Sequence, residues 1–243
     1  MRKPDRFPQS RAEARRRRVV ATGVSIAGAG LLGTSLSSKP GSPQFYAWTL
    51  GTAATWVVGG LASGPLHLGW TNHHVPRRPV ITPVLMGVGA FAVFYGCALA
   101  SRRIPVLNRA IARVLRYAHR GDDPSVLVTT LVTGAAEEVF FRGAVYAAAG
   151  TGHPVAVSTA VYALVTSATR NPALVLASTA MGTLFGLQRR ATGGIQMPLL
   201  THLTWSALML RFLPPLFSDD QAGAPNGEIP QGQHPRSNSD TGG

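Results

Sequence analysis

Three long apolar stretches occupy the first hundred residues of the chain. They lie at residues 19–37, 45–63 and 80–100, and none of them contains an acidic side chain. Because a hydrocarbon core of about 30 Å requires about 20 apolar residues per helix, we predict that these segments span a membrane. The first stretch follows an arginine run and could be a signal peptide, but no small-residue cleavage site follows it and further apolar segments do. We therefore interpret it as a retained anchor.

A different pattern follows at residues 101–121, where apolar and basic side chains alternate with helical spacing. The apolar positions recur every three or four residues, and arginines fill the positions between them: Ile104, Leu107, Ile111, Val114 and Leu115 against Arg102, Arg103, Arg109, Arg113, Arg116 and Arg120. This pattern predicts a basic amphipathic helix that lies at the membrane interface.

Four further helices are predicted after Asp122. They cover about 125–149, 154–168, 172–188 and 196–213, with breaks rich in glycine, proline or asparagine between them. These segments are shorter or more polar than the first three, and small residues recur four apart at Ser178, Gly182 and Gly186. Because small residues let helices approach closely, we predict an internally packed bundle, in which these glycines are ordinary packing positions.

These patterns divide the chain into five regions. A basic tail covers residues 1–18, transmembrane helices 19–100, the amphipathic helix 101–121, the helix bundle 122–213, and a tail without an apolar face 214–243, which we expect to be disordered. The expected fold class is all-α, a polytopic membrane bundle of about 6–7 transmembrane helices plus one interfacial amphipathic helix.

Composition agrees with a membrane environment. Hydrophobic residues make up 45% of the chain and charged residues only 14%, which is lean in charge for a soluble protein. The net charge of +13 could suggest nucleic-acid binding, but the arginines form short runs beside apolar segments, where they can reach lipid headgroups. We therefore expect membrane lipids as partners and no nucleic acid.

The orientation in the membrane is less well determined by the sequence. The basic N-terminus and Arg77-Arg78 both favour the cytoplasmic side, which a hairpin of the first two spans allows. A third full span would place 102–120 outside, unless one of the apparent spans is partial or re-entrant. Because the chain is rich in Arg, Ala and Gly, as in GC-rich bacteria, we expect a multi-pass protein of the bacterial inner membrane with a cytoplasmic N-terminus.

Cysteine and most histidines carry little information about a site. The single cysteine, Cys97, excludes an intrachain disulfide and any cysteine-cluster metal site, and we interpret it as a packing residue. Three of the seven histidines, His67, His73 and His74, cluster near Trp70. We interpret that cluster as an interfacial loop rather than a metal site.

Adjacent glutamates stand out because the other eight acids lie in predicted tails or loops. Glu137 and Glu138 fall in the middle of a predicted helix, where a charge at membrane depth costs a few kcal/mol and usually serves a function. Glu138 and Arg142 are four residues apart and can pair, whereas Glu137 points about 100° away. Glu137 is therefore a candidate general base. Alternatively, the group is a buried polar clamp that only fixes helix register.

The remaining candidate residues lie in the last helix. His202 is the one histidine in an apolar helix of this half, and Ser206 lies one turn further on the same face. They could bind the same water or substrate carbonyl as Glu137. Alone, His202 could instead satisfy a neighbouring backbone carbonyl.

The segment Glu137-Glu138-Val139-Phe140-Phe141-Arg142 resembles the E-E-x-x-x-R motif of the CPBP family of intramembrane proteases, which includes the CAAX prenyl proteases and bacteriocin-processing proteins. Downstream, the glycine-rich helix, the Thr-Gly turn and the helix at His202 are similar to the family's final H-x-x-x-N-type motif. The resemblance covers residues 126–213.

The resemblance implies a site built on the first glutamate and two histidines, which position the hydrolytic water. Here Glu137 and His202 are present, Ser206 replaces the usual asparagine, and Thr166 stands where the F-x-x-x-H pattern would place a histidine. One carboxylate and one imidazole are too few for a zinc site, so we expect no cofactor and metal-free water activation.

Three functions remain open at this point. The first is an intramembrane endopeptidase acting on a membrane-proximal peptide or membrane-protein substrate, with Glu138 and Arg142 supporting Glu137 and with Ser206 and Thr166 as polar auxiliaries. The second is a catalytically silent relative that binds a peptide or stabilises a partner membrane protein, which the missing histidine favours. The third is a proton or cation path, which lacks a second acidic helix.

Overall fold

The computed structural model describes residues 10–69, 80–120, 123–150 and 152–217. Across these residues the regular secondary structure is helical and contains no strand, which confirms the all-α prediction. The elements in chain order are α1 Arg11–Ser35, α2 Pro43–Ser63, α3 Ile81–Ser101, α4 Pro105–Arg120, α5 Asp123–Glu137, the π-helix η1 Glu138–Val145, α6 Tyr146–Ala148, α7 Pro154–Ser167, α8 Pro172–Thr192, α9 Gln196–Phe212 and the 3-10 helix η2 Pro214–Phe217.

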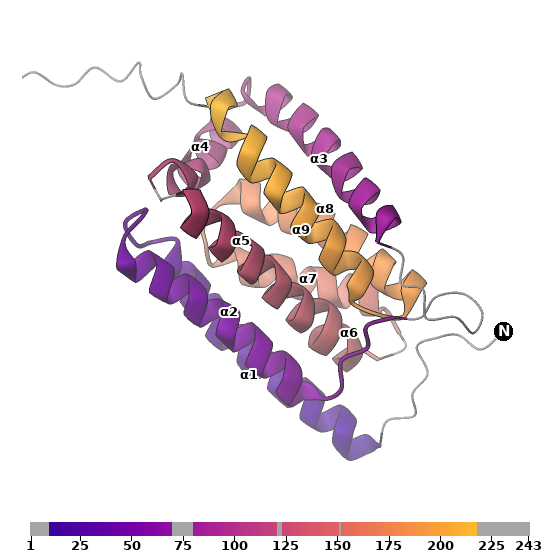
Figure 1. Cartoon of the computed structure of the whole chain (residues 1–243). Helices are drawn as coiled ribbons and strands as arrows, with labels where there is room; N and C mark the ends of the chain where they lie inside the picture. Colours follow the sequence, from indigo (N-terminus) through magenta and orange to yellow (C-terminus); the bar gives the residue numbers. More distant parts are fainter. Residues whose placement is uncertain (1–9, 70–79, 121–122, 151, 218–243) are drawn as a thin grey trace, which may run out of the picture.

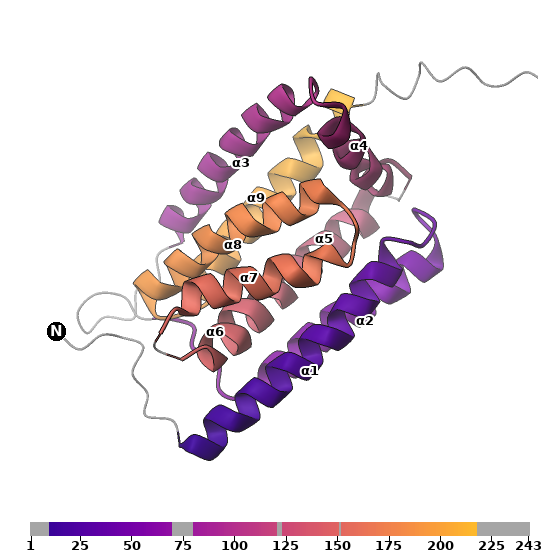
Figure 2. The ribbon, with the colours of Figure 1, turned by 180° about the vertical axis from the view of Figure 1, so that it is seen from behind.

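The helices form a bundle in which α5 takes the central place. The hairpin of α1 and α2 packs on one side of α5, and α9 packs on the other and carries α3 on its outer face (Figure 1). The pair α7 and α8 covers the back of this layer (Figure 2). Residues of α5 and of the continuing η1 therefore face α2, α7, α8 and α9, which places the adjacent glutamates at the centre of the molecule.

An aromatic core joins the α1–α2 hairpin to η1. Trp56 of α2 is fully buried and stacks on Phe140 at a centroid distance of 4.7 Å, with Phe141 at 5.2 Å. Gly28 of α1 lies directly against the Trp56 ring, since a Cβ there would come within 1.9 Å of it. This core fixes one side of the helix that carries the glutamates.

Both predicted tails contribute ordered structure at their inner ends. α1 begins at Arg11, eight residues before the predicted apolar span, because Ser10 and Glu13 form a capping box at its start. Glu13 therefore lies in a helix rather than in a tail. At the other end, η2 buries Phe217 against Ala98, Leu115 and Leu213, so the expected disorder from residue 214 is wrong for the first four residues.

The amphipathic helix lies across one end of the bundle (Figure 1). As α4 it buries Ala110 and Leu115, while Arg109, Arg113 and Arg116 are exposed. The hydroxyl of Tyr117 donates hydrogen bonds to the carbonyls of Leu36 and Ser38, at 2.7 and 2.9 Å, and so ties α4 to the turn after α1. The predicted amphipathic pattern is confirmed: Ile111 and Leu115 of the apolar face pack on protein, while Ile104 is exposed. The place of α4 at the membrane interface stays a prediction.

Two of the described helical segments are long and apolar enough to cross a membrane, namely Ile81–Ser101 and Pro124–Ala148, and Pro154–Ser167 is apolar but shorter. The expected 6–7 spans are therefore not confirmed. Charge lowers the hydropathy of several other helices: α1 starts with a run of arginines, and α8 ends with Arg189 and Arg190. Cys97 lies exposed on α3, which corrects its interpretation as a packing residue. Trp70, His73, His74 and Arg77-Arg78 lie outside the described residues.

Candidate active site

The helix that carries the two glutamates changes its winding between them. α5 ends at Glu137, and the π-helix η1 starts at Glu138, where the sequence pattern predicts an uninterrupted α-helix. Two carbonyls of this segment accept hydrogen bonds from other helices: Phe141 from the Ser158 hydroxyl at 2.9 Å and Arg142 from Arg189 Nε at 3.1 Å. π-segments within α-helices occur frequently at functional sites. The wider turn changes the relative directions of the side chains on either side of it.

Glu138 is the buried member of the pair. Its Oε1 accepts from Arg142 Nη1 at 3.2 Å and lies 2.9 Å from His202 Nδ1, and neither the Glu138 nor the Arg142 side chain is exposed. The predicted pairing of Glu138 with Arg142 is thus confirmed. A carboxylate oxygen accepts, so Nδ1 of His202 is the donor of this contact, and in the tautomer that carries its hydrogen on Nδ1 the other nitrogen, Nε2, is an acceptor.

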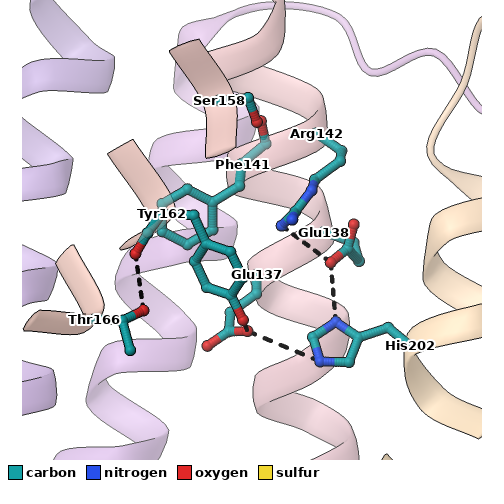
Figure 3. A network of polar contacts seen from close by, with 8 residues as sticks. All are labelled: Glu137, Glu138, Phe141, Arg142, Ser158, Tyr162, Thr166 and His202. Atoms are coloured by element: carbon teal, nitrogen blue, oxygen red, sulfur yellow. Dashed lines mark hydrogen bonds and ion pairs between the residues drawn. The ribbon is translucent and has the colours of Figure 1, made fainter. Parts of the chain in front are cut away.

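Glu137 is the accessible member. Its side chain remains 13% exposed, and its Oε2 accepts a hydrogen bond from the Tyr162 hydroxyl at 2.5 Å. The same Oε2 lies 4.0 Å from Nε2 of His202. Figure 3 shows the imidazole ring lying between the two carboxylates, with one nitrogen directed to each. The sequence predicts a separate partner for Glu137, and that partner is Tyr162, but both glutamates also share His202.

The His202 ring has further neighbours besides Glu138. It stacks on Phe185 of α8 with a centroid distance of 4.8 Å and an interplanar angle of 26°, and the Trp205 ring lies at 5.9 Å. Gly134, one turn before Glu138, also lies close: a Cβ at this position would meet Nε2 at 3.4 Å. Gly134 therefore leaves open the space beside the nitrogen that faces Glu137.

Arg142 supplies the positive charge of the buried group. Its guanidinium carbon lies 4.7 Å from the centroid of the Tyr162 ring and 5.0 Å from that of Phe185, so aromatic faces flank the cation. Nε and Nη2 of Arg142 and Oε2 of Glu138 are buried without a hydrogen-bond partner among the described residues. One arginine thus offsets the charge of Glu138 in a site closed to solvent on this side.

The two predicted polar auxiliaries lie on the expected helices but do not join this network. Thr166 of α7 is buried, and its hydroxyl donates to the carbonyl of Tyr162 in its own helix at 2.8 Å. Ser206 of α9 is buried one turn after His202, and its hydroxyl forms no hydrogen bond with Glu137, Glu138 or His202 in the described part of the chain.

Sequence reasoning missed the role of Tyr162. The residue stands at the aromatic position of the F-x-x-x-H-like segment, where the pattern specifies a ring but no hydrogen-bonding group. The available signal was the hydroxyl itself, which a phenylalanine lacks. Gly134 was missed as well, since a helical glycine four residues before a glutamate resembles an ordinary packing position.

The donor set does not fit a catalytic zinc ion. Within the described residues no group of three or more His, Cys, Asp or Glu side chains is placed to hold a metal. Oε1 of Glu138 bonds to Nδ1 of His202, and Oε2 of Glu138 is enclosed away from solvent, so Glu137 and Nε2 of His202 are the two donors that face each other, whereas catalytic zinc sites use three protein ligands.

Residues 124–208 match the family model described as type II CAAX prenyl endopeptidase Rce1-like. This segment runs from the start of α5 into α9 and contains Glu137, Glu138, Arg142, Tyr162, Thr166, His202 and Ser206. No curated protein and no solved structure matches the chain.

Proposed function

We propose that the chain is a glutamate-dependent intramembrane endopeptidase, on the premise that residues 124–208 match the family model of the Rce1-like type II CAAX prenyl endopeptidases. The family supports a membrane protease as the kind of function. The proposal adds the mechanism, in which Glu137 activates water, and the substrate class, a peptide bond close to the membrane.

The observation that carries the proposal is the relation of Glu137 to His202. Glu137 Oε2 and His202 Nε2 lie 4.0 Å apart, and both can accept a hydrogen bond. A water molecule at about 2.8 Å from each atom can donate one O–H to the carboxylate and one to the imidazole. Its oxygen lone pair is then free to attack a carbonyl carbon. Gly134 keeps the necessary space beside Nε2.

The remaining groups have supporting parts in this mechanism. As the water attacks, its proton passes to Glu137, which then gives the proton to the leaving amine, so the peptide bond breaks without a net change at the enzyme. Glu138 orients the His202 ring through its contact with Nδ1, and Arg142 holds Glu138 in place through their ion pair. In this mechanism the hydroxyl of Ser206, one turn after His202, would donate one hydrogen bond to the oxyanion.

The test compares the purified protein in detergent with its Glu137→Ala and Glu137→Gln variants on a library of membrane peptides. We expect both variants to lose peptide cleavage by about 10²- to 10⁴-fold, the usual contribution of a general base. Glu13→Gln is the matched control, since Glu13 is exposed at the start of α1. Cleavage that persists in the Glu137 variants, or that is absent from all proteins, would contradict the proposal.

A second candidate is a catalytically silent relative that uses this site to bind a peptide or a partner membrane protein. Thr166 favours it, because its hydroxyl bonds within α7 and gives no help to Glu137. In that case peptides from the library would bind without being cleaved, and Glu137→Gln would leave their affinity nearly unchanged. Peptide cleavage by the wild type and peptide affinity of Glu137→Gln therefore distinguish the two candidates.

A further inference from the structure

Resting on the proposed function, we infer that Tyr162 is a positioning residue for Glu137 and takes the place of the histidine that the family pattern puts at residue 166. The hydroxyl of Tyr162 donates to Glu137 Oε2 at 2.5 Å. This oxygen is also the one that faces Nε2 of His202. Tyr162 therefore holds the carboxylate oxygen that would receive the proton of the attacking water.

The tyrosine ring is well fixed for this task. It packs on Phe141 at a centroid distance of 4.6 Å, and the guanidinium of Arg142 lies 4.7 Å from its centroid. Across the ring, Gly182 of α8 comes close enough that a Cβ there would lie 3.4 Å from the ring edge. With the ring held from three directions, the hydroxyl has little freedom except to point at Glu137 (Figure 3). Such a fixed donor lowers the cost of orienting the base.

The contrast with Thr166 assigns the role to Tyr162 rather than to the position of the missing histidine. The two residues are one turn apart on α7, yet only the side chain of Tyr162 reaches a glutamate. The hydroxyl of Thr166 donates its hydrogen bond to the backbone carbonyl of Tyr162 at 2.8 Å. Within the F-x-x-x-H-like segment, the side chain that contacts Glu137 is thus Tyr162 at the first position and not Thr166 at the last.

The first experiment removes only the hydroxyl, in the full-length protein in detergent. Tyr162→Phe keeps the ring contacts with Phe141 and Arg142, so KM and the unfolding temperature should stay close to those of the wild type. We expect kcat to fall about 10- to 100-fold, because a hydrogen bond to a charged group is among the stronger ones. Tyr117→Phe is the matched control, because it too removes a hydrogen-bonded tyrosine hydroxyl. The Tyr117 hydroxyl donates to two backbone carbonyls outside the site, so its loss should leave kcat unchanged.

The second experiment tests the replacement. The double variant Tyr162→Phe with Thr166→His restores the family pattern, and we expect it to recover most of the kcat lost in Tyr162→Phe. A folded double variant that stays as slow as Tyr162→Phe would overturn the replacement. Wild-type kcat in Tyr162→Phe, or a change in KM alone, would overturn the positioning role. Both failures leave the proposed function standing if Glu137→Ala is inactive, whereas an active Glu137→Ala removes the proposed function itself.

Discussion

Arg142 contacts the buried carboxylate of Glu138 at 3.2 Å, and neither side chain is exposed. Removal of the arginine leaves an uncompensated charge in the interior, which typically costs about 3–5 kcal/mol. We predict that Arg142→Ala lowers the free energy of unfolding by about this amount. Chemical unfolding of the purified protein in detergent, followed by circular dichroism, measures the change.

The control for this prediction is Arg113→Ala. Arg113 is exposed on α4, so its removal should change stability by less than about 0.5 kcal/mol. If Arg142→Ala unfolds at the same denaturant concentration as Arg113→Ala, the buried Glu138–Arg142 pair has no part in stability. It would then also fail as the support that orients the His202 ring.

Gly134 provides a steric test for the water position. A Cβ at this residue meets Nε2 of His202 at 3.4 Å, an ordinary van der Waals contact, so Gly134→Ala should fold without strain. The added methyl fills the space beside Nε2 in which the water would bind. We therefore predict a loss of about 10- to 100-fold in peptide cleavage, with unfolding unchanged or slightly delayed.

Gly89→Ala on α3 is the comparison, because a Cβ there meets no atom within 4 Å. An alanine in that helix should be neutral or stabilising by up to about 1 kcal/mol and should leave cleavage untouched. Equal cleavage by the Gly134 and Gly89 variants would exclude a water beside Nε2, and with it the proposed geometry of attack.

Metal removal tests the same chemistry from another direction. With one carboxylate and one imidazole nitrogen left over, the site offers fewer ligands than zinc needs. Incubation with EDTA or 1,10-phenanthroline followed by gel filtration should therefore leave cleavage intact. Activity that disappears on chelation and returns with added zinc would overturn metal-free water activation.

The local spacing of residues predicts one part of this site and misses another. The Glu138–Arg142 pair follows from a four-residue spacing on one helix, which sequence alone supplies. The hydrogen bond between Tyr162 and Glu137 joins residues 25 apart on different helices. It depends on how α7 packs against η1, which helical periodicity does not encode. His202 was predictable as a partner, but its position between both glutamates was not.

Close packing of helix α1 on α2 depends on glycines at defined positions. A Cβ at Gly28 would lie 1.9 Å from Trp56, whereas a Cβ at Gly30 meets no atom within 4 Å. We predict that Gly28→Ala destabilises the protein by about 1–3 kcal/mol through overpacking of the aromatic core. Gly30→Ala, two residues further on the same helix, should be neutral or slightly stabilising. Thermal unfolding of the two variants in parallel tests the hairpin, and equal unfolding temperatures would contradict this packing.

Helix boundaries were largely predictable, since Gly, Pro and Asn breaks set most of them. α7 and α9 begin and end within one residue of their predicted limits. The π-segment η1 was not predictable, because donors from distant parts of the chain, Ser158 and Arg189, bond two of its carbonyls. α8 continues to Thr192, beyond its predicted end, since Gly193 adopts a left-handed conformation with φ 67° and ends the helix there.

The two ends of the bundle both carry exposed arginines. The start of α1 lies at one end with Arg15, and α4 lies across the opposite end with Arg113 (Figures 1 and 2). Positive charge therefore does not distinguish the cytoplasmic side by itself. The path of α3 determines on which side each end of the bundle lies. If Ile81–Ser101 crosses the whole membrane, as its length and hydropathy allow, Arg15 and Arg113 face different compartments.

This arrangement gives a prediction of topology that needs no activity. In a Cys97→Ser background, which removes the single native cysteine, Arg15→Cys and Arg113→Cys each introduce one exposed thiol. With a cytoplasmic N-terminus, a membrane-impermeant maleimide added to intact cells should label Arg113→Cys, and it should label Arg15→Cys only after the cells are permeabilised. Labelling of both thiols under the same condition would mean that α3 enters and leaves on one side as a re-entrant segment. The energetic reason for a full crossing is that α3 exposes Ile81, Leu85 and Val93 along its length, and this apolar surface is stable only in lipid.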